Sequence, residues 1–306
     1  MRLKIKRRVR LAAMRAEPCP PARSPVDLRG KRVLLTGASS GIGAAAAEKF
    51  AAAGATVILV ARRERLLNEL AGRITSRGGR AIVMPVNLVD LYAVDDLVAD
   101  AGPVDILINN AARSIRRPLA ESLERWHDVE RIMDLNYYSP LRLIRGLAPG
   151  MIERGDGHVI NVASWRVLPE ASPLFGPYIA SKSALSAVSR VIETEWGHLG
   201  VHSTTLYYPL VATPMVSATD AYYGMPALSS EEAAEWMMAA ARRRPVRIAP
   251  RMAVAAKALD VFAPKLLNRL LTPPVDPAAA GPPVMDHEPV PPPAVLPHKE
   301  RFSGTL

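Results

Sequence analysis

Short runs of apolar, β-branched residues alternate with longer helical patterns from residue 32 onward. Such alternation is typical of a parallel sheet whose crossover helices cover both faces. Strands are predicted near residues 32–36, 56–61, 81–86, 104–108, 158–162, 201–207 and 246–248. Helices are predicted near residues 41–53, 62–76, 90–99, 119–147, 177–197, 231–243 and 251–270. This order predicts an α/β fold of the Rossmann type, with a doubly wound, seven-stranded parallel sheet.

The two ends of the chain differ in composition from this alternating part. Residues 1–15 carry seven basic residues and no acidic one, and ten of the chain's 28 prolines lie between Pro273 and Pro297. A proline-rich segment without apolar periodicity does not build a packed core. Four parts are therefore expected along the chain. They are a basic extension over residues 1–27, a single folded domain over 28–250, a C-terminal helix over 251–271 and a disordered tail over 272–306.

The basic extension permits two interpretations. Its apolar residues could form one face of a short helix, which would permit peripheral contact of residues 1–15 with an anionic membrane surface. Alternatively, these residues are a disordered basic start. The chain has no long uncharged apolar stretch, which argues against a secretory signal and a spanning helix. The single cysteine, Cys19, forms no internal disulfide, so a cytoplasmic location is expected, with membrane association as the variant.

Two other kinds of ligand are not expected. Apart from the basic extension, the chain has no motif or basic-aromatic platform typical of nucleic-acid binding. The six histidines are scattered, and the only pair spaced four apart, His198 and His202, straddles Gly200. No metal site is therefore predicted.

A glycine-rich turn joins the first predicted strand to an alanine-rich helix. Its sequence is Thr36-Gly37-Ala38-Ser39-Ser40-Gly41-Ile42-Gly43. Glycine permits a turn too tight for a side chain and lets backbone amides approach a pyrophosphate at the positive end of a helix. A glycine triplet alone is a weak signal, but its place after the first strand of an alternating chain favours a dinucleotide site.

Two arginines, Arg62 and Arg63, follow the second predicted strand. In a dinucleotide-binding fold this position faces the adenosine ribose. A carboxylate here would accept a hydrogen bond from the free 2′-hydroxyl of NAD, whereas a guanidinium favours the 2′-phosphate of NADP. Arg62 therefore predicts NADPH as the cofactor in preference to NADH.

A tyrosine and a lysine lie four residues apart in the segment Tyr178-Ile179-Ala180-Ser181-Lys182. On a helix this spacing places both side chains on one face. A free tyrosine is a poor base at neutral pH, but an adjacent cation favours the phenolate and makes proton exchange feasible. Ser164 ends the preceding strand, so its hydroxyl can point at the same carbonyl group.

Five ordered motifs carry a family resemblance. They are TGASSGIG at 36–43, NNAA at 109–112, Asn136, NVAS at 161–164 and YIASK at 178–182. On these motifs the chain resembles the short-chain dehydrogenases/reductases over residues 28–250. The resemblance implies a catalytic domain and an assembly as a homodimer or homotetramer.

The resemblance also implies a role for each catalytic position. Tyr178 would protonate the substrate oxygen as hydride arrives, and Lys182 would hold the nicotinamide ribose and lower the phenol pKa. Ser164 would orient and polarise the carbonyl, and Asn136 would hold a water in the proton relay. The expected cofactor contacts are Thr36, Gly37, Ser39, Ser40, Gly41, Ile42, Gly43, Arg62, Arg63, Asn87, Leu88, Asn110, Ala111, Tyr178, Lys182, Pro209, Leu210, Val211 and Thr213.

Three positions depart from the family pattern. Asn87 stands where an aspartate usually contacts adenine, and its amide still offers hydrogen bonds. Ala112 replaces the usual glycine of the NNAG turn, which is a mild change. Pro209-Leu210 stands where Pro-Gly is usual, and the Leu210 side chain would crowd the approach of the nicotinamide ring. Cofactor binding is the step that these departures affect.

The segment 214–240 is expected to cover the substrate. Its methionines and aromatic residues would adapt to a flexible apolar chain, although ordinary helix packing explains part of the set equally well. The set is Met215, Val216, Tyr222, Tyr223, Met225, Trp236, Met237 and Met238.

Three further stretches resemble actinobacterial fatty acyl-CoA reductases and lipid keto-reductases. They are PALSSEEAA at 226–234, RPVRIAPR at 244–251 and APKLLN at 263–268. The resemblance implies an NADPH-dependent reductase of a lipid-like acyl, keto-acyl or aldehyde substrate. The alternatives are an NADP-dependent dehydrogenase of a hydroxylated lipid or sterol, and a non-catalytic dinucleotide-binding scaffold or sensor.

Overall fold

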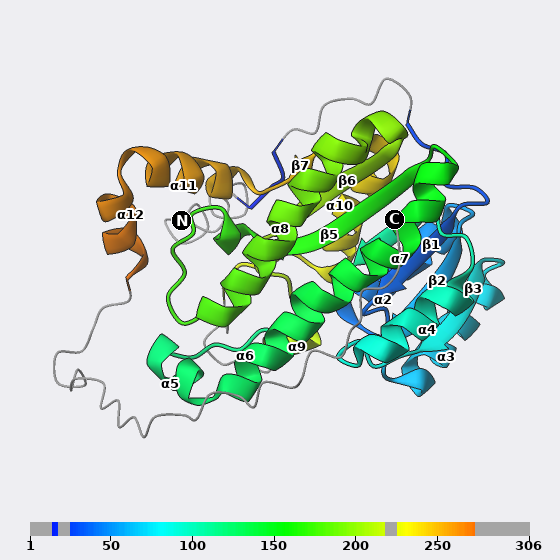
Figure 1. The fold of residues 1–306 in the computed structure, drawn as a ribbon, viewed down its shortest axis with the longest axis horizontal. Helices are drawn as coiled ribbons and strands as arrows, with labels where there is room; N and C mark the ends of the chain where they lie inside the picture. The colour runs from blue at the N-terminus through cyan, green and yellow to red at the C-terminus, as the bar shows by residue number, and fades with distance from the viewer. Residues whose placement is uncertain (1–13, 18–24, 218–224, 273–306) are drawn as a thin grey trace, which may run out of the picture. The chain divides into compact units, whose positions relative to one another are not determined.

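A computed structural model describes residues 14–17, 25–217 and 225–272. The described residues form a seven-stranded sheet in the order β3-β2-β1-β4-β5-β6-β7 (Figure 1). All six strand pairs are parallel. The strands are β1 (Arg32–Thr36), β2 (Thr56–Ala61), β3 (Arg80–Pro85), β4 (Ile106–Asn109), β5 (Gly157–Ser164), β6 (Val201–Tyr208) and β7 (Arg247–Ile248). The predicted fold class is confirmed, with strand ends that differ by at most two residues from the predicted ones.

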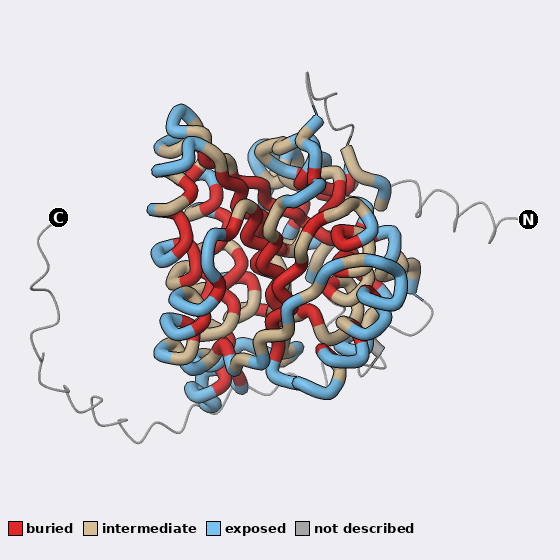
Figure 2. Tube along the Cα trace, turned by 90° about the vertical axis from the view of Figure 1, so that its right-hand side faces the viewer, coloured by how far each residue is buried: buried red, intermediate tan, exposed pale blue. Residues whose placement is uncertain are grey.

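The central strands are apolar on both faces because helices cover both sides of the sheet. In β1, Val33 and Leu35 pack into one apolar cluster and Leu34 packs into another, as the alternation of side chains along a strand requires. Figure 2 shows the buried segments gathered at the centre of the molecule and the exposed ones around them.

Three helices pack on each face of the sheet. The first cluster includes buried residues of α2 (Gly41–Ala52), α3 (Glu64–Ser76) and α10 (Ser230–Arg243). The second includes residues of α4 (Leu91–Ala101), α7 (Ser139–Glu153) and α8 (Gly176–Trp196). In Figure 1, α7 and α8 cross in front of the sheet.

The helix predicted over residues 119–147 is four elements in the structure. These are α5 (Leu119–Glu124), α6 (Trp126–Met133), a π-helical turn η1 (Asp134–Tyr138) and α7. Arg125 leaves helical geometry, with φ −107° and ψ 59°, and so separates α5 from α6. The helix also continues past the predicted end through Pro149, because Ala148 and Met151 are buried against the sheet. Tertiary packing here overrides the local stop signal.

The C-terminal helix predicted over residues 251–271 is divided into α11 (Arg251–Phe262) and α12 (Pro264–Leu271). Ala263 separates them, with φ −146° and ψ 61°. A residue that precedes proline is pushed out of the helical region by the proline ring, which explains the break. The predicted proline-rich tail lies outside the described residues, except for Thr272.

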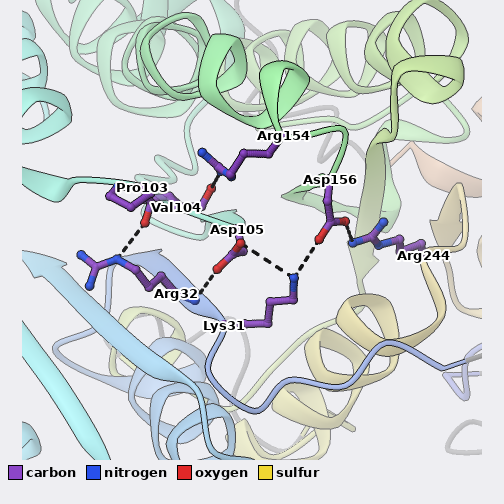
Figure 3. A network of polar contacts seen from close by, with 8 residues as sticks. All are labelled: Lys31, Arg32, Pro103, Val104, Asp105, Arg154, Asp156 and Arg244. Carbon is purple, nitrogen blue, oxygen red and sulfur yellow. Dashed lines mark hydrogen bonds and ion pairs between the residues drawn. The ribbon is translucent and has the colours of Figure 1, made fainter.

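A polar network holds the amino ends of β1, β4 and β5 together (Figure 3). Asp156, which precedes β5, accepts hydrogen bonds from Lys31 at 2.8 Å and Arg244 at 2.5 Å. Asp105, which precedes β4, accepts from the backbone of Arg32 at 2.7 Å. Partial burial raises the pKa of Asp156, but the bonds from Lys31 and Arg244 outweigh it and lower the pKa below its usual value. These contacts fix the amino edge of the sheet and leave the carboxyl edge for ligands.

Candidate functional site

A cavity of about 800 Å³ opens at the carboxyl edge of the sheet. Winding of the chain reverses between β1 and β4, and ligands of doubly wound folds bind at such a switch point. Most of the predicted site residues line this cavity. They are Gly37, Ser39, Ser40, Gly41, Ile42, Arg62, Arg63, Asn87, Leu88, Asn110, Ala111, Ser164, Tyr178, Pro209, Leu210, Val211 and Thr213.

Four predicted residues are not on the cavity wall: Thr36, Gly43, Asn136 and Lys182. All four are buried and pack behind the wall. The Thr36 hydroxyl accepts hydrogen bonds from the backbone amides of Asn110 at 2.9 Å and Ala111 at 3.0 Å. It thereby joins the turn after β1 to the turn after β4.

The glycines between β1 and α2 are required by close backbone packing. A Cβ at Gly37 would lie 2.9 Å from the Cα of Ala111, and one at Gly43 would lie 2.2 Å from the carbonyl oxygen of Gly37. A Cβ at Gly41, whose φ is +57°, would lie 3.1 Å from Thr213. The turn is therefore packed to the backbone, and the unpaired amides of the first turn of α2 are free to bind an anion. This geometry fits the pyrophosphate of a nicotinamide dinucleotide.

The two arginines after β2 differ in their contacts. Arg63 donates hydrogen bonds of 2.8 Å to the hydroxyls of Ser39 and Ser40 in the glycine turn. Arg62 is exposed and has no hydrogen bond or ion pair to another described residue. Both line the cavity. The guanidinium of Arg62 is therefore the one available for a ligand phosphate.

Ser164 and Tyr178 both line the cavity. Ser164 ends β5, and its hydroxyl accepts a long hydrogen bond of 3.4 Å from the amide of Arg166. Tyr178 lies in the first turn of α8, where its ring packs edge-on against Phe175 with centroids 6.3 Å apart. A hydroxyl and a phenol thus face one space from a strand end and a helix start.

Lys182 lies one helical turn beyond Tyr178 and is fully buried, with 1% of its surface exposed. Its Nζ donates a hydrogen bond of 2.8 Å to the carbonyl oxygen of Val162. Burial disfavours the charged form and lowers the pKa of Lys182 to about 7. A lysine with such a pKa exchanges protons at neutral pH more readily than an exposed one.

Asn136 joins the loop after β4 to α8. Its side chain accepts from the amide of Arg113 at 2.8 Å and donates to the carbonyl of Arg113 at 2.9 Å. The same amide nitrogen donates to the hydroxyl of Ser181 at 3.0 Å, and that hydroxyl donates to the carbonyl of Tyr178 at 2.7 Å. Asn136 is held in the π-helical turn η1, a distortion often found at functional sites.

The loop Pro209–Thr213 is paired with a second segment. Leu210 accepts a hydrogen bond from the amide of Leu228 at 2.9 Å, and Ala212 donates one of 2.8 Å to the carbonyl of Leu228. Val211 and Leu228 form a parallel bridge. This pairing fixes the backbone of Leu210, which lines the cavity.

The predicted substrate cover is only partly correct. Met215, Val216 and Met225 line the cavity. Trp236, Met237 and Met238 do not. On α10, Met237 and Met238 are buried in the core, and Trp236 packs against it and stacks on Tyr208 with ring centroids 5.4 Å apart. Ordinary helix packing therefore explains these three residues. Tyr222 and Tyr223 lie outside the described residues.

Several lining residues were missed by sequence reasoning. Met14 and Met252 bring two further thioethers to the wall, and Arg113 and Arg131 bring two further guanidinium groups. No local motif marks them, since they reach the cavity only through the tertiary fold. The described lining includes five arginines and no acidic residue, which makes the cavity attractive to anions.

Two features are absent from the described part of the chain. It contains no cluster of three or more metal-ligating side chains. No helix in it is both long enough and apolar enough to span a membrane.

The sequence is similar to a known protein family and to curated proteins. A family model described as short chain dehydrogenase covers residues 31–223. A fatty acyl-CoA reductase of Mycobacterium tuberculosis is 66% identical over 273 residues, which are 86% of this chain and 93% of that protein. A fatty acyl-CoA reductase of Acinetobacter baylyi is 44% identical over 250 residues, with coverages of 80% and 84%.

Solved structures show the same fold. A 3-oxoacyl (acyl-carrier-protein) reductase from Agrobacterium tumefaciens with NADP bound superposes with a TM-score of 0.66 at 28% identity, over 72% of this chain and 90% of that one. A metagenomic short-chain oxidoreductase in complex with NADP gives 0.61 at 26% identity, over 71% and 92%.

Proposed function

The chain belongs to the short-chain dehydrogenase/reductase family of oxidoreductases, and from that premise we propose that it uses NADPH to reduce a carbonyl group of a long-chain acyl, keto-acyl or aldehyde substrate. The observation that carries the proposal is that Ser164 and Tyr178 share one cavity with the glycine turn after β1. Two relatives that are named fatty acyl-CoA reductases support a lipid substrate.

The glycine turn and its neighbours are proposed to hold the cofactor. The amides around Gly41 would bind the pyrophosphate, and Asn87 and Leu88 would lie against the adenine. Thr213 would hold the carboxamide. When bound, the nicotinamide supplies the hydride, and the protein supplies binding and orientation.

Tyr178 is proposed as the proton donor to the substrate oxygen. Ser164 would donate a hydrogen bond to the same oxygen and stabilise the negative charge that develops there. Lys182 would hold the nicotinamide ribose and help to lower the phenol pKa. The bonds of Asn136 to Arg113 and Ser181 support a role in holding the loop after β4 against α8, in addition to the expected proton relay.

A cytoplasmic location and assembly as a homodimer or homotetramer belong to this proposal. The family resemblance supports the assembly, and the lone Cys19 supports a reducing compartment. Membrane contact through residues 1–15 stays a prediction, because residues 1–13 lie outside the described part of the chain.

Replacing Arg62 by alanine is expected to raise KM for NADPH about 10–100-fold and to leave KM for NADH nearly unchanged. The loss corresponds to about 1.5–3 kcal/mol for a hydrogen bond between charged groups. Arg65→Ala is the matched control, since Arg65 is exposed on α3 and does not line the cavity. Equal changes for both cofactors would show that Arg62 does not read the 2′-phosphate.

The function is tested by following NADPH and NADH oxidation with palmitoyl-CoA, hexadecanal and a β-keto acyl thioester. NADP⁺ reduction with a long-chain alcohol and a sterol tests the reverse direction. Turnover of an acyl or aldehyde substrate with NADPH is the expected result. Turnover of the sterol alone would make the protein a hydroxylipid dehydrogenase, and tight NADPH binding without any turnover would favour a non-catalytic sensor.

A further inference from the structure

A short N-terminal segment, residues 14–17, is fixed against the body of the protein. The amide of Glu17 donates to the carbonyl of Ala249 at 2.7 Å, and the amide of Arg251 donates to the carbonyl of Arg15 at 3.1 Å. These two bonds make an antiparallel bridge between Ala16 and Pro250. Figure 1 draws this segment in dark blue beside β7 and the start of α11. We name residues 14–17 the strap.

An ion pair adds to the backbone contacts of the strap. The Nε of Arg247 lies 3.0 Å from the carboxylate of Glu17, and both side chains are partly shielded from solvent. The side chain of Ala16 packs against the first apolar cluster. Three kinds of contact thus converge on four residues: backbone hydrogen bonds, an ion pair and apolar packing.

The strap ends in the cavity. Met14 lines the wall, as does Met252, which directly follows the residue that hydrogen-bonds to Arg15. Ala249 and Val254, on either side of Met252, belong to the apolar cluster against which Tyr178 packs. The start of α11, to which the strap is bound, thus connects to the apolar cluster around Tyr178.

We propose that the strap carries Met14 into the substrate site, where Met14 and Met252 bound the space for the acyl chain and so set the chain length that the enzyme accepts. This inference rests on the proposed lipid substrate. Thioethers are flexible and polarisable, so they pack well against an alkyl chain. Ala249 and Arg251 bind the backbone of the strap, and Arg247 binds the Glu17 carboxylate. Met14 is the strap residue that lines the cavity.

Chain-length selectivity tests the proposal in the full-length protein. Met14→Trp is expected to lower kcat/KM for palmitoyl-CoA or hexadecanal about tenfold relative to kcat/KM for octanoyl-CoA or octanal. A single group that fits poorly in an apolar pocket changes kcat/KM by about tenfold or more. Arg15→Trp is the matched control, because the exposed Arg15 side chain does not line the cavity. An unchanged ratio in Met14→Trp, or an equal change in Arg15→Trp, would overturn the proposal.

A labelling experiment gives a readout that does not depend on turnover. In a Cys19→Ser background, which removes the chain's only cysteine, Met14→Cys and Arg15→Cys are treated with N-ethylmaleimide. Palmitoyl-CoA is expected to slow labelling at position 14 but not at 15, and free CoA to slow neither. Equal rates with and without palmitoyl-CoA would overturn the strap's role. Protection at position 14 in a protein that reduces no substrate would instead contradict the proposed function alone.

Discussion

Tyr178→Phe is expected to lower kcat for carbonyl reduction by about 10²–10⁴-fold, because the variant lacks the hydroxyl that donates the proton. The dissociation constant for NADPH is expected to change by less than about twofold, since the loss falls on an interaction of the transition state. The phenylalanine ring keeps the edge-on contact with Phe175. Steady-state kinetics and fluorescence titration of NADPH measure the two quantities separately.

Tyr92→Phe provides the matched control for this loss. Tyr92 is exposed on α4, outside the cavity lining, and its ring lies 5.7 Å from the guanidinium of Arg142. The change also removes one phenolic oxygen, yet kcat should stay at the wild-type level. A Tyr178→Phe protein that keeps more than about a tenth of wild-type kcat would show that another group donates the proton.

Gly43→Ala is expected to weaken NADPH binding by at least about 100-fold and to lower the free energy of unfolding by about 1–3 kcal/mol. The added Cβ would lie 2.2 Å from the carbonyl oxygen of Gly37 and 2.9 Å from the Nδ2 of Asn110. The first of these is a backbone atom, so the glycine turn itself must shift. NADPH titration and thermal unfolding measure the two effects.

Gly72→Ala is the control for a glycine outside the site. A Cβ at Gly72, in the middle of α3, meets nothing within 4 Å. Alanine suits a helix better than glycine, so this change should leave NADPH binding intact and raise stability by up to about 1 kcal/mol. If Gly43→Ala bound NADPH as well as Gly72→Ala does, the pyrophosphate would not lie at this turn.

The local sequence was sufficient to predict the sheet and the chemical groups of the candidate site. Alternating strand and helix patterns are repeated often enough to define a parallel sheet, so all seven strands were found. The glycine turn, Arg62 and the Tyr178–Lys182 spacing each carry a local physical reason for their residue types. Short-range rules were enough because each motif lies on one strand, one turn or one helix.

Long-range packing decided the remaining features. The break between α11 and α12 has a local cause, because Pro264 disfavours helical geometry at Ala263. The continuation of α7 through Pro149, in contrast, depends on burial of its residues against the sheet. The aromatic side chain of Trp236 would suit a substrate cover, but the orientation of α10 packs it against the core and onto Tyr208. Side-chain type does not tell which face of a helix turns toward a cavity.

The strap shows most clearly what the tertiary structure added. In the sequence, Met14 belongs to a basic extension far from Met252, and no pattern relates the two. In the structure, the bridge between Ala16 and Pro250 places them on one cavity wall. The sequence therefore determined the fold class and the reactive groups, because these depend on local periodicity and spacing. The boundary of the substrate space was decided by contacts between segments more than 200 residues apart, such as the Glu17–Arg247 ion pair with a separation of 230.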